Sequence, residues 1–208
     1  AKVLTKDDVY SLSLPIVIGS AQVMRWALDV LGKQAKVLVI DEPMDAQFVP
    51  GIINVIDPEL FDFSELEFGK IQRLAGEAAY KYLTQAIDLA MANEVDAIVT
   101  APLSKEAMNL SGFHFDGHTE ILATQTKSKK VSMMLASEGF RVTHVSTHVS
   151  LRTAIERCKT ERILDVIRLT HQALRQMDID NPMIGVAGLN PHCGENGLFG
   201  NEDVEQIQ

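Results

Sequence analysis

Residues 15–32 read PIVIGSAQVMRWALDVLG, and the order of residue types predicts a strand followed by a helix. The first four residues form a short apolar run that ends at a glycine, as a buried strand does. Ser20 is a suitable N-cap for a helix over residues 21–31, because its hydroxyl can accept a hydrogen bond from the first turn. Gly32 is suitable just beyond this helix, where the backbone often turns left-handed. Strand–turn–helix units of this kind build α/β proteins.

The alternation of strand-length apolar runs and helical periods continues along the chain. Further strands are expected at residues 36–40, 52–56, 97–100, 131–136, 141–147 and 183–187. Helices are expected at residues 69–93, 120–126 and 161–177. This alternation predicts an α/β fold with a largely parallel central sheet flanked by helices. No internal repeat, low-complexity tract or long linker marks a firm boundary between domains.

The composition is that of an ordinary globular protein, with 46% hydrophobic and 23% charged residues among 208. The net charge is −9 and no basic run exceeds KSKK at residues 127–130, which disfavours nucleic acid as a partner. An anionic substrate would need a few cations placed locally. Cys158 and Cys193 are too few for a disulfide framework, so both are expected as reduced thiols of a cytoplasmic protein. No apolar stretch approaches the roughly 18 residues of a membrane span, so no membrane partner is expected.

Four polar clusters stand where the predicted elements end or begin. Three follow predicted strands: TAPLSK at 100–105, STH at 146–148 and NPH at 190–192. The fourth, GHTE at 117–120, precedes a predicted helix. Ligands of open α/β sheets bind beyond the carboxyl ends of the strands. We therefore expect these clusters to converge on one edge of the sheet.

The six histidines are not equivalent in their predicted positions. His114, His144 and His171 are expected to be structural, with His144 hydrogen-bonded on or near a strand. His148 and His192 each stand at a predicted strand end, where neutral imidazoles from two strands can meet at one metal ion. The alternative is that both are ordinary strand-end residues, because the residues alone show no third ligand.

The loop at residues 188–200, GLNPHCGENGLFG, is rich in groups that packing alone does not require. Asn190 and Glu195 flank His192 and are expected to hold its ring in one tautomer and rotation. Cys193 is expected to be a small buried thiol. Three glycines spaced by three residues indicate a tight turn rather than the G-x-G-x-x-G nucleotide motif, which the chain lacks. The alternative is that these glycines only close a surface loop.

Four motifs taken together resemble the 4-hydroxythreonine-4-phosphate dehydrogenase family of pyridoxine biosynthesis. They are TAPLSKE at 100–106, DGHTE at 116–120, STHVSLR at 146–152 and GLNPHCGE at 188–195. Their order and spacing match the family over essentially the whole chain. The STHVSLR and GLFG versions are more similar to the branch acting on 4-phospho-D-threonate and 4-phospho-D-erythronate.

The resemblance implies roles for particular residues. His118 and Thr119 correspond to the substrate-binding pair of the family, and His148 and His192 to two ligands of a divalent metal such as Zn, Mg or Co. The family's third metal histidine, other substrate-binding residues and an early glycine-rich segment have no counterpart in residues 1–208. The chain is therefore expected to be partial, without the N-terminal and C-terminal segments of the family. The resemblance also implies an isocitrate/isopropylmalate dehydrogenase-like fold and a homodimer.

The implied activity is an NAD-dependent oxidation of a CH–OH group, with decarboxylation of a phosphorylated four-carbon hydroxy acid. The substrate would be 4-phosphohydroxy-L-threonine, 4-phospho-D-threonate or 4-phospho-D-erythronate. A divalent metal suits such chemistry because it stabilises the negative charge that develops on oxygen. The alternative function is a non-catalytic α/β protein that binds a metal or a phosphate.

Overall fold

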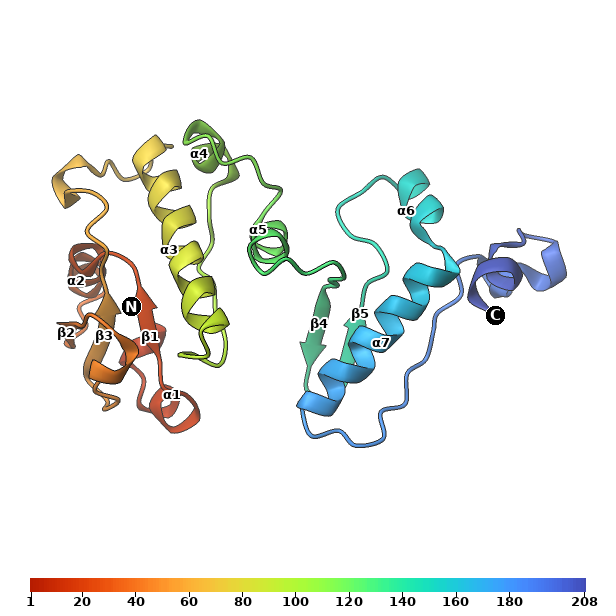
Figure 1. The fold of residues 1–208 in the computed structure, drawn as a ribbon, viewed down its shortest axis with the longest axis horizontal. Helices are drawn as coiled ribbons and strands as arrows, with labels where there is room; N and C mark the ends of the chain where they lie inside the picture. Colours follow the sequence, from red (N-terminus) through yellow and green to blue (C-terminus); the bar gives the residue numbers. More distant parts are fainter. The chain divides into compact units, whose positions relative to one another are not determined.

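The computed structural model describes all 208 residues and divides into two compact units, residues 1–127 and 128–208 (Figure 1). The regular elements of the first unit are η1 (Val3–Thr5), α1 (Asp7–Leu12), β1 (Ile16–Ile18), α2 (Ala21–Val30), β2 (Lys36–Val39), η2 (Pro43–Asp45), β3 (Ile52–Ile56), η3 (Phe63–Glu65), α3 (Arg73–Met91), α4 (Lys105–Leu110) and α5 (His118–Gln125). Those of the second are β4 (Met134–Ser137), β5 (Phe140–Thr143), α6 (Leu151–Arg157), α7 (Thr160–Gln176), η4 (Pro191–Gly197) and η5 (Asp203–Ile207).

The first unit is built on a three-stranded parallel sheet in the order β1-β3-β2. The central strand β3 is almost wholly buried, as a parallel strand covered on both faces should be. Its one polar member, Asn54, is 1% exposed; its side-chain oxygen accepts from the Gln47 N–H at 2.9 Å, and its amide nitrogen donates to the Gln47 carbonyl at 3.0 Å. Ala21 and Leu28 of α2 pack with Ile53 and Val55 of β3 in one core cluster. The α/β fold with a parallel sheet flanked by helices is thereby confirmed.

The predicted strand–turn–helix unit forms as the sequence indicates. The Ser20 hydroxyl accepts a hydrogen bond from the Val23 N–H at 3.4 Å, and Gly32 has φ +59° just beyond the helix. A second cap comes from the end of β3, where the Asp57 carboxylate accepts a bond from the Ala21 N–H at 2.8 Å. A carboxylate at a helix N-terminus is favoured by the helix dipole. The cap therefore joins β3 to α2.

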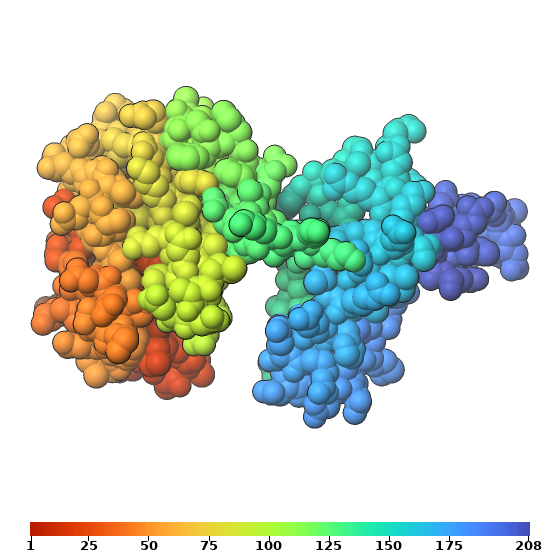
Figure 2. All heavy atoms as spheres, in the orientation of Figure 1, coloured from red at the N-terminus to blue at the C-terminus, as the bar shows by residue number.

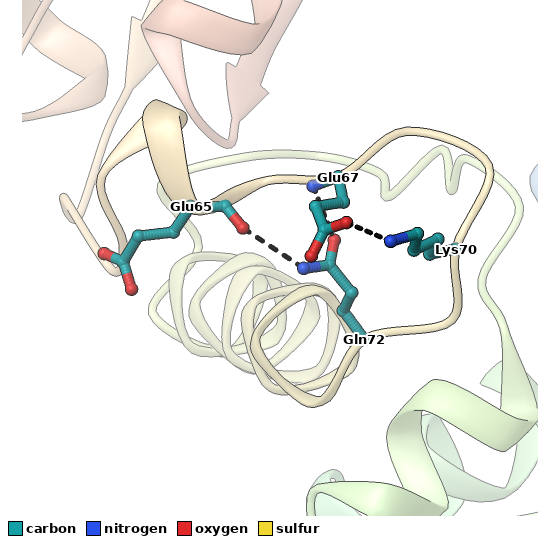
Figure 3. Close-up of polar contacts among 4 residues, drawn as sticks. All are labelled: Glu65, Glu67, Lys70 and Gln72. Atoms are coloured by element: carbon teal, nitrogen blue, oxygen red, sulfur yellow. Dashed lines mark hydrogen bonds and ion pairs between the residues drawn. The ribbon is translucent and has the colours of Figure 1, made fainter.

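The long helix α3 begins from a loop that is fixed by its own polar side chains. Gln72 donates to the Glu65 carbonyl at 3.1 Å and accepts from the Glu67 N–H at 2.7 Å, while Lys70 pairs with the Glu67 carboxylate (Figure 3). One side chain therefore satisfies two backbone groups before the first helical turn. Gln72, the N-cap residue of α3, is thereby bonded to the loop that precedes the helix.

Helices α3 and α4 touch at a position that requires glycine. The atoms of α4 lie directly against those of α3 in the space-filling view (Figure 2). A Cβ placed on Gly76 of α3 would lie 2.1 Å from the carbonyl carbon and oxygen of Ala107 in α4. Leu83, Ile87 and Met108 continue the same contact as a buried cluster.

Gly76→Ala is therefore expected to destabilise the protein. The added methyl group must push backbone away, so the loss in free energy of unfolding should lie at the upper end of the roughly 1–3 kcal/mol typical of overpacking. Urea unfolding would measure it. Gly185→Ala is the matched control, because a Cβ there meets nothing within 4 Å. Equal stability of the two variants would show that α3 and α4 leave room for a methyl group at Gly76.

The second unit combines an antiparallel hairpin with the amphipathic helix α7. Strands β4 and β5 pair from Met134↔Thr143 to Ser137↔Phe140 around Gly139, whose φ is +76°. Arg162 of α7 donates to the carbonyl oxygens of Val145 at 2.9 Å and Val131 at 3.0 Å. These bonds tie the helix to both chain segments that flank the hairpin.

Two predicted strands do not form, and two are shifted. Residues 97–100 and 183–187 belong to no strand, and their backbone makes no hydrogen bond within the chain. Val99 and Met183 within them are 97% and 98% exposed. A strand exists only where a neighbour accepts and donates its backbone bonds, and neither segment has one in residues 1–208. The hairpin strands also lie at 134–137 and 140–143 rather than at 131–136 and 141–147.

No helix of this chain combines the length and the apolar character needed to cross a bilayer.

Candidate functional site

Two of the four polar clusters come together in the first unit. Lys105 is the first residue of α4, and its Cε lies 3.9 Å from the position that a Cβ on Gly117 would occupy. The Lys105 side chain is exposed and makes no ion pair. The loop at 100–105 thus brings an unpaired cation beside the motif at 116–120. The loop at 100–105 was among the expected polar clusters, but nothing in its sequence distinguishes Lys105 from its neighbours.

His118 and Thr119 start the helix α5 that follows this cation. Gly117 before them is the N-cap residue of the helix, with an extended backbone at φ +156° and ψ −169°. His118 is half-buried and lines a cavity of about 550 Å³, while Thr119 is exposed. The free N–H groups and dipole of a helix N-terminus favour an anion. A lysine side chain, a helix N-terminus and an imidazole together can bind an anionic group here.

His148 lies in the second unit, between β5 and α6. It is exposed, has φ +56° and makes no hydrogen bond, so both ring nitrogens are free. The neighbouring His144 differs: its N–H donates to the Met133 carbonyl at 3.0 Å, and its Nδ1 lies 3.2 Å from the same oxygen. The structural role expected for His144 is confirmed.

His192 lies in an unusual left-handed turn. Five consecutive residues, 192–196, have positive φ between 43° and 80°. Left-handed backbone costs a residue other than glycine roughly 1–2 kcal/mol, and it persists only where the surroundings hold it. Gly194 is buried, and a Cβ on it would lie 2.5 Å from the Gly200 carbonyl oxygen. The predicted need for glycines in a tight turn is confirmed.

Asp203, which no sequence motif marked as functional, holds the segment that leads into this turn. Asp203 is 2% exposed, and its carboxylate accepts bonds from the Leu189 N–H at 2.8 Å and the Asn190 N–H at 3.0 Å. The Asn190 amide also donates to Asp203 at 2.9 Å and to Glu202 at 2.8 Å. Glu195, which was expected to support His192, makes no hydrogen bond to it. The hydrogen bonds that hold the segment before His192 therefore come from Glu202 and Asp203, which lie beyond the turn.

Cys193 within the turn and Asp203 beyond it differ in exposure and in charge. Cys193 is exposed, so the expectation of a buried thiol is wrong. Burial by itself would raise the pKa of Asp203, but the hydrogen bonds from Leu189 and Asn190 outweigh burial and hold that pKa below its ordinary value. The carboxylate is therefore charged at neutral pH.

The candidate metal ligands His148 and His192 have the right chemistry but form an incomplete set. Both imidazoles lie in the second unit, are exposed and make no hydrogen bond. No three His, Cys, Asp or Glu side chains group so as to hold a metal ion. Catalytic zinc takes three protein ligands, so two histidines could supply only part of such a site. Whether they share one ion remains a proposal.

Comparison with known proteins gives the context for these residues. The family described as "Pyridoxal phosphate biosynthetic protein PdxA" matches residues 11–208. The chain belongs to the PdxA family. Among curated PdxA relatives, the D-threonate 4-phosphate dehydrogenase of Pectobacterium atrosepticum is 44% identical over 92% of this chain and 59% of its own length. The enzyme of that name from Salmonella typhimurium is 40% identical over 98% of this chain and 62% of its own length.

Solved PdxA structures share the fold. The 4-hydroxythreonine-4-phosphate dehydrogenase of Burkholderia phymatum superposes with a TM-score of 0.90 at 40% identity, over 99% of this chain and 62% of that one. A terephthalate 1,2-cis-dihydrodiol dehydrogenase from Burkholderia xenovorans is more distant, with a TM-score of 0.64 at 27% identity. The chain thus spans about three fifths of the length of the relatives that it matches. The resemblance inferred from the four motifs is confirmed.

Asp203→Asn is expected to loosen the turn that carries His192. An amide oxygen cannot replace a carboxylate that accepts three bonds, so hydrogen exchange at the Leu189 and Asn190 amides should speed up roughly 10- to 100-fold. Glu205→Gln, an exposed change in the same element, is the control. Because the folded pKa of Asp203 lies below its unfolded value, its contribution is present above the ordinary aspartate pKa and is lost as pH falls through the lowered one. Unchanged exchange in Asp203→Asn would refute this role.

Proposed function

We propose that this chain is part of an NAD-dependent, divalent-metal-dependent dehydrogenase that oxidises and decarboxylates a phosphorylated four-carbon hydroxy acid. Membership of the PdxA family carries the proposal, because curated relatives are named D-threonate 4-phosphate dehydrogenase. The proposed preferred substrate is 4-phospho-D-threonate, ahead of the 4-phosphohydroxy-L-threonine implied by the names of the solved relatives. The working unit would be a homodimer.

The residues of the first unit would bind the anionic substrate. His118 and Thr119 would contact it at the N-terminus of α5, where the free N–H groups of the first turn favour negative charge. Lys105 would add a positive charge beside Gly117, as its position and lack of an ion pair allow. Lys105 would supply the local positive charge that a chain of net charge −9 needs in order to bind an anion.

The residues of the second unit would hold the metal through neutral imidazoles. His148 and His192 would each offer one ring nitrogen, and Asp203 would keep the turn at His192 in place through the backbone of Leu189 and Asn190. A bound divalent ion supplies Lewis-acid chemistry, which stabilises negative charge developing on the substrate oxygen. NAD, when bound, would supply the hydride acceptor. No residue of this chain is assigned to NAD.

The test of substrate choice requires the full length of a family member. A hybrid can be made in which this chain replaces the matched region of the P. atrosepticum protein. NADH formation should then show a kcat/KM for 4-phospho-D-threonate at least about tenfold above that for 4-phosphohydroxy-L-threonine, a difference of roughly 1.4 kcal/mol. A higher kcat/KM for 4-phosphohydroxy-L-threonine would instead indicate the substrate preference of the pyridoxine-pathway enzymes. Metal or phosphate binding without any NADH formation would favour the non-catalytic alternative.

A further inference from the structure

A second pocket of the first unit lies where α2 ends and β2 begins. Its volume of about 570 Å³ falls within the roughly 300–1,000 Å³ of small-molecule sites. Its lining includes Arg25 and Asp29 of α2, Lys33 and Gln34 of the connecting loop, and Lys36, the first residue of β2. Three of these side chains carry a positive charge and one carries a negative charge. We call it the basic pocket.

The three cations of the basic pocket have no ionic partner. Arg25, Lys33 and Lys36 make no ion pair, and Asp29, one helical turn after Arg25, makes none either. The pocket therefore keeps a net charge of +2 within a chain of net charge −9. A concave surface lined by one sign of charge concentrates its electric field and attracts ions of the opposite sign. The uncompensated charge of the pocket thus favours an anion.

The loop that lines the basic pocket also offers free backbone donors. The N–H groups of Lys33 and Lys36 are bonded to carbonyl oxygens at 2.9 and 2.8 Å, but those of Gln34 and Ala35 between them make no hydrogen bond within the chain. Successive backbone N–H groups that have no partner bind anionic oxygens in many phosphate sites. The pocket therefore combines side-chain cations with backbone donors.

The rest of the lining restricts the kind of anion. No aromatic residue lines the basic pocket, and only Leu28 and Ala35 of its lining are apolar. Ring-shaped ligands such as nucleobases are held by mostly apolar and aromatic walls, which this pocket lacks. Arginine and lysine bind phosphate and carboxylate oxygens through charge-assisted hydrogen bonds, and three separate cations can neutralise more than one anionic group.

We propose that the basic pocket binds a small polyanion that carries two or more phosphate or carboxylate groups and no aromatic ring. The site is separate from the proposed substrate-binding residues. Lys36 starts β2, so the pocket lies at the amino end of the parallel strands. His118 instead lines a cavity together with Gly19 and Ser20, which follow the carboxyl end of β1. Binding at the basic pocket therefore does not depend on the proposed dehydrogenase reaction.

Inorganic pyrophosphate is the probe, titrated calorimetrically into the hybrid with the P. atrosepticum protein. Arg25→Ala and Lys33→Ala should each weaken its binding about tenfold, the lower end of what one charge-assisted hydrogen bond contributes, because the pocket is open to solvent. Asp29→Asn should strengthen binding roughly threefold, since it removes a like charge. Lys6→Ala is the matched control, because Lys6 is exposed, makes no ion pair and lies outside the pocket.

Two further measurements separate this site from the substrate-binding residues. Lys105→Ala should leave pyrophosphate binding at the basic pocket unchanged. In the absence of pyrophosphate, Arg25→Ala and Lys33→Ala should form NADH from 4-phospho-D-threonate at the rate of the parent hybrid. Inorganic phosphate, with one anionic group, should bind at least about tenfold more weakly than pyrophosphate. A hybrid without dehydrogenase activity that still binds pyrophosphate through Arg25 and Lys33 would refute the proposed function and support the basic pocket.

Three results would overturn the proposal. One is the absence of saturable pyrophosphate binding in the folded hybrid, which would mean that the additional chain neutralises or covers these cations. Another is binding that is lost in Lys105→Ala and unchanged in Arg25→Ala and Lys33→Ala, which would place the anion at the substrate-binding residues. The third is equal weakening by Lys6→Ala, which would reduce the effect to attraction by overall charge. Binding that is weakened by Arg25→Ala and Lys33→Ala, strengthened by Asp29→Asn and unaffected by Lys6→Ala supports the site.

Discussion

His192→Ala in the full-length hybrid is expected to abolish metal-dependent turnover while leaving the fold intact. Removing a metal ligand forfeits the several kcal/mol of charge stabilisation that the ion supplies, which corresponds to a fall in kcat of roughly 1000-fold or more. The fold should survive because the His192 ring is exposed and makes no hydrogen bond. Steady-state NADH formation and the circular dichroism spectrum would measure the two effects separately.

A binding measurement distinguishes loss of the ligand from a general defect. Isothermal titration of Zn²⁺ or Co²⁺ into the hybrid should show weakened binding for His192→Ala and for His148→Ala. His171→Ala, an exposed histidine of α7 in the same unit, should bind metal like the parent. Full metal-dependent activity in His192→Ala would remove His192 from the metal site and leave the left-handed turn without its proposed purpose.

The second large effect is expected at His118. His118→Ala in the hybrid should lower kcat/KM for 4-phospho-D-threonate roughly 10- to 100-fold, because one charge-assisted hydrogen bond to the anion is worth about 1.5–3 kcal/mol. Lys105→Ala should act in the same direction and mainly through KM, since a lysine that contributes charge binds ground state and transition state alike. Both effects should shrink at high ionic strength.

The control for His118 is His114, four residues earlier. His114 is exposed, and its Nδ1 lies 3.1 Å from the Asn109 amide oxygen, so a structural role accounts for it. His114→Ala should leave kcat and KM unchanged. If His118→Ala lowers the melting temperature and leaves the kinetics unaltered, His118 only stabilises the start of α5 and does not bind substrate.

The sequence predicted the elements whose signals are local. Ser20 and Gly32 mark the two ends of α2 because capping depends on residues within a turn of the helix. Strand β3 forms at the predicted residues 52–56, where an almost continuous apolar run meets the condition for a buried parallel strand. The helices α3 and α7 likewise follow their apolar periods.

The sequence could not predict what depends on distant partners. Residues 97–100 and 183–187 have strand composition, but composition does not supply the neighbour that completes a strand. Asp203 was missed for a similar reason, since its bonds go to the backbone amides of Leu189 and Asn190, which carry no side-chain signal. The pairing of Lys105 with Gly117 also required the fold, because α4 and α5 are separate helices.

The product balance of the full-length hybrid acting on 4-phospho-D-threonate tests the proposed reaction most directly. We expect one NADH and one carbon dioxide to form for each substrate molecule consumed. Both should cease on chelation by EDTA and return when a divalent metal is restored. Turnover that is insensitive to chelation, or NADH formation without carbon dioxide, would rule out a metal-dependent oxidative decarboxylation in which His148 and His192 bind the metal.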